Sequence, residues 1–510
     1  MRRSKVRELH IRMLVTRTGA DASSQETAQA GHLLARFHTS ERARERVRQT
    51  IEAEATRKWL ENHERGSSAI VLRRISRALW RKFNRLNAPV VYPWSPSRRG
   101  TAVAHELHRI AAALTRRRAA GFGARLWLAA KAAVWLPLAT LATLPVLWRN
   151  GPGVRERHGH GLGAQWRDLL DAAWCHGIFP TEYYHHRVYR GSARTDKSRY
   201  LNEREIVALL AACDTGGHAE RVDNVFRFLS ECRTIGLPVP RTFAAFSGGS
   251  CEFFAGPEVE SLPHKDLYFR PEAWSPRVAA QIWRWNAQAG RWQHRAESLG
   301  AAALIERCRT LSGGQPYLLQ ECLRNHPDVE RFSAGGLCTV RIASGIAETG
   351  EPVPLFATLH LPACDAGGAV TPAGELHAGI DVSTGELLTA WGEFVSDGEF
   401  DSHPGTGAIM RGVALPHWRG ALDLAIRAHR NFRELPFVGW EIGLSAGGPV
   451  LLEARSNWGV FHHALAIESA FPRLCLHRLA HAETAVTDQG HPAPEPHSAA
   501  MRETGRALRS

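Results

Sequence analysis

The stretch GWEIGLSAGGPVLLEARSNWG (439–459) decides the fold. Two runs rich in apolar residues, 439–445 and 449–455, flank a Gly-rich turn, and this arrangement predicts a β-hairpin. Each predicted strand presents one carboxylate within its run, Glu441 and Glu453. The hairpin therefore predicts two acids on paired strands, close to the C-terminal end of a folded domain.

Upstream of this hairpin, short β-rich runs alternate with helical runs, as in a domain that mixes helices and strands. The segment RVDNVFRFLSECRTIGLPVP (221–240) predicts a helix stopped by Gly236, with Pro238 and Pro240 leading into a strand. The other predicted strands are RTFAAF (241–246), DLYFR (266–270), YLLQECL (317–323), LCTVRIAS (337–344) and VPLFATLHLP (353–362).

Several short motifs in this order carry a family resemblance. They are AAWCHGIFPTEYYHHRVYR (172–190), LRNHP (323–327), CTVRI (338–342), HAGIDVSTGEL (377–387), HPGTG (403–407) and LPFVGWEIG with GPVLLEA (435–454). Together, from about residue 172 to about residue 470, the chain resembles the sugar-transfer-associated branch of ATP-grasp proteins, which is related to alpha-L-glutamate ligases. The resemblance implies an α+β (α/β) ATP-grasp domain.

The same resemblance implies a reaction and its cofactors. Such enzymes use ATP and Mg²⁺ to convert a carboxylate into an acyl phosphate, which an amine then displaces. Charge builds up on phosphoryl oxygens in this chemistry, so the site needs a cation held by hard oxygen ligands, together with fixed positive charges. Neither the carboxylate nor the amine substrate can be identified from the sequence.

The site residues are carried over by position. The resemblance implies catalytic positions at Arg324, Arg341 and His403; nucleotide-binding positions at Arg270, Gln320, Glu321, Cys322 and Leu323; and metal ligands at Glu441 and Glu453. Each has a plainer alternative. Segment 320–323 would look the same as an ordinary buried strand, Arg341 could be a surface strand residue, and the glycines after His403 could form an ordinary tight turn.

The chain also departs from the family pattern. Asn224 and Arg270 stand where relatives place lysines, and EAWSPRVAAQIW (272–283) replaces a Gly-rich loop. Arg455 stands where an Asn is usual, with Asn457 as a substitute two positions later. Arginine differs from lysine in geometry, and a loop without Gly cannot bring its backbone as close to a phosphate. The alternative function is therefore a degenerate ATP-grasp domain that binds nucleotide without efficient turnover.

The net charge of +14 comes from the N-terminal region. Residues 1–120 hold 26 Lys+Arg and 10 Asp+Glu, a balance of +16, and the remaining residues balance to −2. The predicted organisation is a basic, mainly helical region (1–120), an apolar helix and linker (121–160), the ATP-grasp domain (161–482) and a disordered tail (483–510). A basic arm is typical of a segment that meets an anionic surface, although a solvated helical face would look the same.

An apolar segment, LWLAAKAAVWLPLATLATLPVLW (126–148), is long enough to cross a bilayer. Lys131, Pro137 and Pro145 interrupt it, so a buried or membrane-surface helix is favoured over a true span. We expect a cytoplasmic protein, peripheral at the inner face of the membrane, that meets anionic lipid through residues 1–150. A membrane-surface scaffold in cell-envelope or polysaccharide biosynthesis is a third hypothesis.

The cysteine and histidine patterns argue against a disulfide framework and against a histidine-based metal centre. The nine Cys form no CxxC pair, which favours a reducing compartment over a disulfide framework. The HxH pair His158/His160 has no nearby Cys or Asp to complete a site, so no His-based metal centre is predicted. No recognised nucleic-acid-binding module accompanies the basic arm, and no specific nucleic-acid partner is predicted.

Overall fold

The computed structural model describes residues 102–118, 121–190, 197–254, 262–272, 280–333, 335–362, 375–392, 399–458 and 468–488. The chain divides into two compact units, Met1–Arg77 and Ala78–Ser510, and all described residues lie in the second. Most of the predicted basic region and most of the predicted tail therefore lie outside the described residues.

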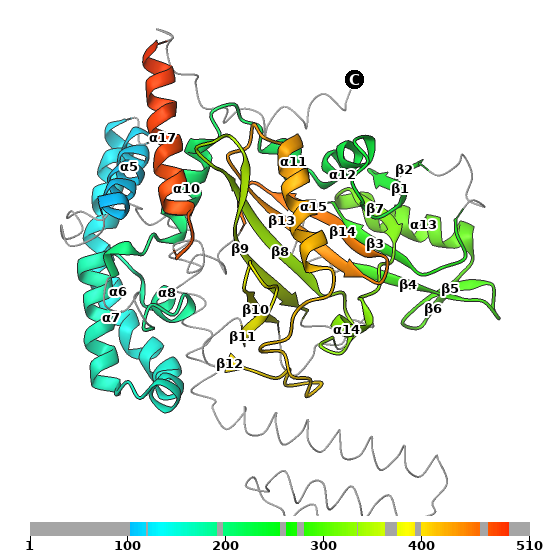
Figure 1. Ribbon diagram of the computed structural model, residues 1–510, viewed down its shortest axis with the longest axis horizontal. Helices are drawn as coiled ribbons and strands as arrows, with labels where there is room; N and C mark the ends of the chain where they lie inside the picture. Colours follow the sequence, from blue (N-terminus) through cyan, green and yellow to red (C-terminus); the bar gives the residue numbers. More distant parts are fainter. Residues whose placement is uncertain are drawn as a thin grey trace, which may run out of the picture. The chain divides into compact units, whose positions relative to one another are not determined.

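The first sheet is antiparallel, with strand order β2-β1-β7-β3-β4-β5-β6 (Figure 1). Its strands are β1 (Thr242–Ser247), β2 (Ser250–Phe253), β3 (Leu267–Pro271), β4 (Gln281–Asn286), β5 (Arg291–His294), β6 (Glu297–Leu299) and β7 (Tyr317–Glu321). Helix α13 (Ala301–Leu311) packs Leu304, Ile305 and Cys308 into the same core as Phe269 and Trp283 of the strands. The short 3-10 turn η3 (Ser312–Gly314) then leads into β7, near the middle of the sheet.

The second sheet is also antiparallel, with order β12-β11-β10-β9-β8-β13-β14. Its strands are β8 (Thr339–Ile346), β9 (Pro352–Leu361), β10 (Leu376–Ile380), β11 (Leu387–Gly392), β12 (Glu399–Phe400), β13 (Phe437–Ser445) and β14 (Gly448–Arg455). Strands β8 to β12 form a meander, and the β13–β14 hairpin returns to pair with β8. Antiparallel pairing throughout specifies the α+β form of the expected fold.

One face of the second sheet is apolar and covered by α15 (Trp418–Asn431), which lies across it in Figure 1. Val340 and Ile342 of β8 share this core with Leu424 and Ala428 of the helix. Side chains alternate between the faces of a strand, so Thr339 and Arg341 lie on the opposite, polar face. This polar face carries the candidate site.

Shorter helices lie around the sheets and reach the same core. They are α11 (Glu220–Asp223), α12 (Val225–Thr234) and α14 (Pro327–Glu330). Helix α12 ends beside Gly236, whose φ of 73° is the left-handed conformation expected of a glycine that follows a helix. Fully burying Phe228 of α12 against Trp440 of β13 stabilises the fold by roughly 1.5–3 kcal/mol.

A third packing group joins three helices from distant parts of the chain. Helices α5 (Ala102–Arg118), α10 (Glu203–Cys213) and α17 (Phe471–Asp488) share a core with Phe437 and Trp458. Between α5 and α10, His108 contacts Glu205 at 2.8 Å. The end of the predicted basic region therefore packs with the sheet domain, and α17 continues six residues past the predicted domain end at 482.

The apolar segment lies in α6 (Phe122–His158), a 37-residue helix. It packs with α7 (Leu162–His176) and α8 (Pro180–His185), and the 3-10 turn η1 (Lys197–Arg199) follows. One face of α6 is buried, including Trp135, Ala139 and Val146, whereas Leu126, Trp127, Val134, Leu141, Leu144 and Trp148 are exposed. Among the described residues, α6 is the one helix long and apolar enough to cross a membrane, and 31% of its most apolar window is buried.

All seven predicted strands are present. The predicted strands at 241–246, 266–270, 317–323, 337–344, 353–362, 439–445 and 449–455 correspond to β1, β3, β7, β8, β9, β13 and β14. The strands that were not predicted are β2, β4, β5, β6, β10, β11 and β12. Strand β4 begins at Gln281, inside the segment interpreted as a loop (272–283). Residues 273–279 of that segment lie outside the described residues.

Candidate functional site

The register of the β13–β14 hairpin sets the geometry of the site. Glu441 pairs with Glu453 on one side and with Arg341 of β8 on the other. Residues directly opposite each other in an antiparallel pair point to the same face, with Cβ atoms about 4.5–5.5 Å apart. The two acids and Arg341 therefore form one row on the polar face of the second sheet.

Both carboxylate oxygens of Glu441 accept hydrogen bonds. The Arg341 guanidinium donates Nη2–H to Oε2 of Glu441, and the Thr339 hydroxyl donates to Oε1 at 2.7 Å. Burial alone would raise the pKa of Glu441, but the charges of Arg341 and His360 and these hydrogen bonds outweigh it, lowering the pKa to about 2. Glu441 is consequently a carboxylate at neutral pH.

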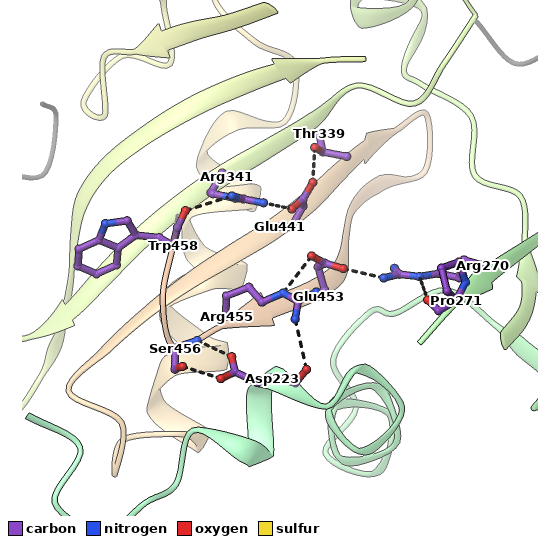
Figure 2. Close-up of polar contacts among 10 residues, drawn as sticks. All are labelled: Asp223, Arg270, Pro271, Thr339, Arg341, Glu441, Glu453, Arg455, Ser456 and Trp458. Atoms are coloured by element: carbon purple, nitrogen blue, oxygen red, sulfur yellow. Dashed lines mark hydrogen bonds and ion pairs between the residues drawn. The ribbon is translucent and has the colours of Figure 1, made fainter. Parts of the chain in front are cut away.

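Glu453 joins the two sheets. Arg270 at the end of β3 donates Nη2–H to Oε2 of Glu453 at 2.7 Å, and Arg455 donates Nε–H to Oε1 at 3.4 Å (Figure 2). The side chains of Arg270 and Glu453 are only 14% and 15% exposed. A charge pair this enclosed interacts in a medium of lower dielectric than water, so it is stronger than a surface pair.

Asp223 fixes the chain just after β14. Its carboxylate accepts hydrogen bonds from the Ser456 backbone N–H at 2.8 Å and from the Ser456 hydroxyl at 2.7 Å. Its carbonyl accepts one from Arg455 Nη1 at 3.4 Å. The next residue, Asn224, caps α12 by accepting the Arg227 backbone N–H at 2.8 Å. Asn224, which replaces a family lysine, therefore has a local structural role.

The predicted nucleotide-binding residues lie at the exit of β7. Gln320 is buried and donates to the Thr242 hydroxyl at 3.1 Å. Glu321 pairs with Lys265 at 2.7 Å. Cys322 donates its backbone N–H to Asp266 O at 3.3 Å.

From there the chain crosses to the second sheet. A Cβ added to Gly443 of β13 would meet a Leu323 methyl group at 3.8 Å, so Leu323 lies against that strand. The His326 backbone N–H donates to Leu444 O at 2.7 Å. The segment 320–323 thus begins a polar linker between the sheets. Its role in reading a base stays a prediction.

Arg324, a predicted catalytic position, pairs with Asp266 at 2.9 Å, and it contacts neither Glu441 nor Glu453 among the ion pairs of the described residues. Its side chain is 80% exposed. Arg270 and Arg341, by contrast, are brought to the two acids. The structure therefore places Arg324 at the edge of the linker, and its role in chemistry stays a prediction.

His403, the third predicted catalytic position, organises its own loop. Its Nδ1 atom accepts the backbone N–H groups of Gly405 at 3.2 Å and Thr406 at 3.1 Å, and its carbonyl accepts that of Gly407 at 2.7 Å. Burial lowers the pKa of His403, which favours the neutral ring that these contacts require. The HPGTG loop is thus a turn held by hydrogen bonds to His403. Its contact with phosphate stays a prediction.

Two groups of polar residues on this face were not predicted from the sequence. Arg455, which departs from the family pattern, contacts both Glu453 and Asp223. Two cross-strand neighbours, His360 of β9 and His377 of β10, lie one row away from Arg341 with Glu375 beside them. The E-x-H spacing of Glu375 and His377 is visible in the sequence, but the approach of His360 depends on strand register.

The chemistry of the donors fits a magnesium ion. Glu441 and Glu453 offer carboxylate oxygens on one face, and Mg²⁺ is usually bound by one or two carboxylates together with phosphates and water. Arg455 stands where an Asn is usual in relatives, so the oxygen-bearing side chains of this row are those of Glu441 and Glu453. Arg270 and Arg341 add positive charge beside these two acids.

A family model described as sugar-transfer associated ATP-grasp matches residues 302–477. The resemblance to this ATP-grasp family is confirmed over that segment. The match runs from α13 through β7 and the whole second sheet into α17, so it includes every predicted site residue except Arg270. The expected ATP-grasp fold is confirmed.

Solved structures of ATP-grasp ligases are also similar, at low identity. D-alanine–D-alanine ligase from Bacillus anthracis complexed with ATP has 9% identity and a TM-score of 0.31, covering 53% of this chain and 69% of that chain. The ATP-grasp ligase PsnB, complexed with minimal precursor, Mg and ADP, has 15% identity and a TM-score of 0.28, covering 55% and 69%. Biotin carboxylase from Campylobacter jejuni has 9% identity and a TM-score of 0.31, covering 54% and 48%. No curated protein matches the chain.

Proposed function

We propose that this protein binds Mg-ATP between its two sheets and joins a carboxylate to an amine through an acyl phosphate. The observation that carries the proposal is the cross-strand pair Glu441/Glu453, flanked by Arg270 and Arg341 from strands of different sheets. Such a group of fixed carboxylates and cations suits phosphoryl transfer, because that chemistry depends on positioning and charge neutralisation.

Each residue has a definable task in this proposal. Glu441 and Glu453 hold Mg²⁺, which when bound neutralises charge on the phosphate oxygens. Arg270 neutralises the nucleotide phosphates from the first sheet, and Arg341 neutralises the phosphoryl group, or the acyl phosphate, from the second. Backbone groups of Gln320–Leu323 bind the base. Because both arginines already pair with the acids, phosphate and metal binding must rearrange these contacts.

An ADP-release screen tests the proposed reaction. The full chain is incubated with Mg-ATP and panels of carboxylates and amines, while ATP binding is measured in parallel by calorimetry. ADP release that requires both a carboxylate and an amine is the expected result. The absence of both ATP binding and ADP release at millimolar Mg-ATP would overturn the proposal.

A degenerate nucleotide-binding domain is the second candidate function, and one observation favours it. Glu453 is contacted by two arginines, and one of them, Arg455, replaces a family Asn. Arginine at that position adds positive charge next to the metal site, which weakens cation binding. ATP binding without ADP release across the panels would favour this function over ligation.

We further propose that the protein is cytoplasmic and associates with the inner face of the membrane, through anionic lipid and the exposed side of α6. This side presents Leu126, Trp127, Leu141, Leu144 and Trp148. Arg116 and Arg117 of α5 and Arg125 of α6 are exposed near its N-terminal end. An apolar helix face flanked by cations suits the interface of an anionic bilayer.

The polar atoms beside this face support a lipid partner. Trp174 of α7 is 47% exposed, but its indole N–H donates to the Thr140 hydroxyl at 2.9 Å. The Thr140 hydroxyl in turn donates to Leu136 O at 2.7 Å, and Trp166 donates to the Thr143 hydroxyl at 3.3 Å. Polar groups that are already paired within the protein can enter an apolar phase at little cost.

A further inference from the structure

Two histidines and a glutamate meet on the polar face of the second sheet. His360 of β9 and His377 of β10 are direct cross-strand partners, and Glu375 immediately precedes β10. His360 is also the partner of Thr339 of β8. The two histidines therefore belong to the row next to the one that holds Arg341, Glu441 and Glu453, and Glu375 lies two residues before His377.

Their donor atoms converge. Glu375 Oε1 lies 2.8 Å from His360 Nε2 and 3.4 Å from His377 Nε2, and the three donor atoms all lie within 4.8 Å of one another. The two imidazole rings are stacked, with centroids 5.2 Å apart and planes 14° apart. The His360 Nε2 atom is enclosed and has no well-aligned hydrogen-bond partner despite the nearby carboxylate.

These separations are close to those between ligands of one small cation. Zinc binds imidazole nitrogen and carboxylate oxygen at about 2.0–2.2 Å, so tetrahedral ligands lie about 3.3–3.6 Å from each other. The 3.4 Å contact of His377 lies within that range, and the 2.8 Å contact of His360 is shorter, so a bound ion would move the Glu375 carboxylate and His360 apart. Two imidazoles and one carboxylate make up a three-ligand set used by catalytic zinc sites, which keep a further position open.

Burial divides the cluster into an anchored part and an open part. The side chain of His377 is 4% exposed, whereas those of His360 and Glu375 are 31% and 41% exposed. His360 and Glu375 thus form the solvent-facing edge of the cluster, where a water or a substrate oxygen would complete the coordination of a bound ion. Softer imidazole donors also set this cluster apart from the all-oxygen pair Glu441/Glu453, because imidazole suits zinc-class metals whereas carboxylates suit magnesium.

We propose that His360, Glu375 and His377 bind one zinc-class divalent cation on the polar face of the second sheet, with one coordination position left open. This site is separate from the proposed magnesium position and does not depend on the proposed ligase reaction. Thr339 connects the two, because it is the strand partner of His360 and donates its hydroxyl to Glu441. An ion here lies next to the row where phosphate is expected to bind.

Cobalt titration of the chelator-treated full chain tests the site, with excess Mg²⁺ present to occupy the all-oxygen position and no nucleotide. The expected result is one equivalent of Co²⁺ with the intense visible absorption of a low-coordinate site, displaced by one equivalent of Zn²⁺. His360→Gln and Glu375→Gln should each weaken this binding by at least about tenfold, the smaller end of what even an outer contact contributes. Both side chains are partly exposed, so these variants are expected to fold.

Two matched controls accompany the titration. His264→Gln removes an exposed histidine that stacks on Trp285 in the other sheet, and it should bind Co²⁺ like the parent. Glu441→Gln alters the neighbouring acid and should leave the cobalt spectrum in place. An absence of Co²⁺ and Zn²⁺ binding, or binding that His360→Gln leaves unchanged, would overturn the proposal.

Discussion

Arg270 and Glu453 lie 183 positions apart in the sequence and form an ion pair at 2.7 Å. The arginine ends β3 of the first sheet, and the glutamate lies on β14 of the second. Both side chains are largely enclosed, so the contact ties the predicted phosphate-binding cation to a predicted metal ligand. A ligand that binds between the sheets must therefore displace this ion pair or contact one of its two side chains.

Glu453→Gln tests the predicted metal ligand. The amide keeps the shape of the side chain but loses the charge, so Mg²⁺-dependent ATP affinity should fall by at least about tenfold, or about 1.4 kcal/mol. Calorimetry with and without Mg²⁺ measures the effect, and circular dichroism checks the fold. Glu252→Gln, at an exposed position of β2, is the matched control. Equal Mg²⁺ dependence in Glu453→Gln and the parent would rule out this ligand.

Arg270→Lys should retain ATP affinity better than Arg270→Ala. Lysine keeps the positive charge and restores the residue usual in relatives, whereas alanine leaves Glu453 with one cation fewer. Hydrogen bonds to charged groups contribute about 1.5–3 kcal/mol, so the alanine variant should lose about 10–100-fold in affinity. If Arg270→Ala binds ATP as tightly as the parent, the end of β3 does not face phosphate.

The buried histidine His429 predicts a pH dependence of stability. Its Nδ1 accepts from the Ser344 hydroxyl at 2.6 Å, the Trp440 indole donates to that hydroxyl at 2.7 Å, and His429 Nε2–H donates to Leu435 O at 2.8 Å. This chain of donors requires a neutral ring. Burial lowers the pKa of His429 from 6.5 to about 4, despite the bond to Leu435.

The unfolded chain therefore binds a proton between pH 6.5 and about 4 that the folded chain does not. Stability from this group is complete above pH 6.5 and falls by up to roughly 3 kcal/mol as the pH drops to 4. Urea unfolding of the parent and of His429→Gln across this range measures it as a difference in slope, so the lower stability of the variant itself does not matter. Parallel slopes in the two proteins would contradict the assignment.

Leu141→Glu tests the membrane proposal. Leu141 is 73% exposed on α6, so a charge there should leave the fold intact while reducing co-sedimentation with anionic vesicles. Leu388→Glu, at a 46% exposed position of β11, should sediment like the parent. The binding should weaken with salt, because exposed charges are screened over about 8–10 Å. A full chain that ignores anionic vesicles at low salt would refute the proposal.

The strands that carry Arg341, Glu441 and Glu453 were predictable because apolar residues alternate along them and glycine marks the turn. Strands β4 and β5 contain Trp283, Trp285 and Trp292 and also alternate, but their pairing depends on contacts with β3 and α13. The pairing of Arg270 with Glu453 could not be predicted from local sequence patterns, because it depends on how the two sheets pack against each other. The meeting of His360 with His377 likewise depends on register, which the sequence of either strand leaves open.

The arginine at position 270 also determines how this protein responds to chemical labelling. Nucleotide analogues that deliver an acyl group mark ATP sites by reacting with a lysine amine beside the phosphates. A guanidinium stays protonated and does not accept such a group, so these analogues should fail to label this strand end even when they occupy the ATP site. Arginine-directed dicarbonyl reagents should instead modify the site, and ATP should protect against them. Arg270→Lys would exchange one reactivity for the other.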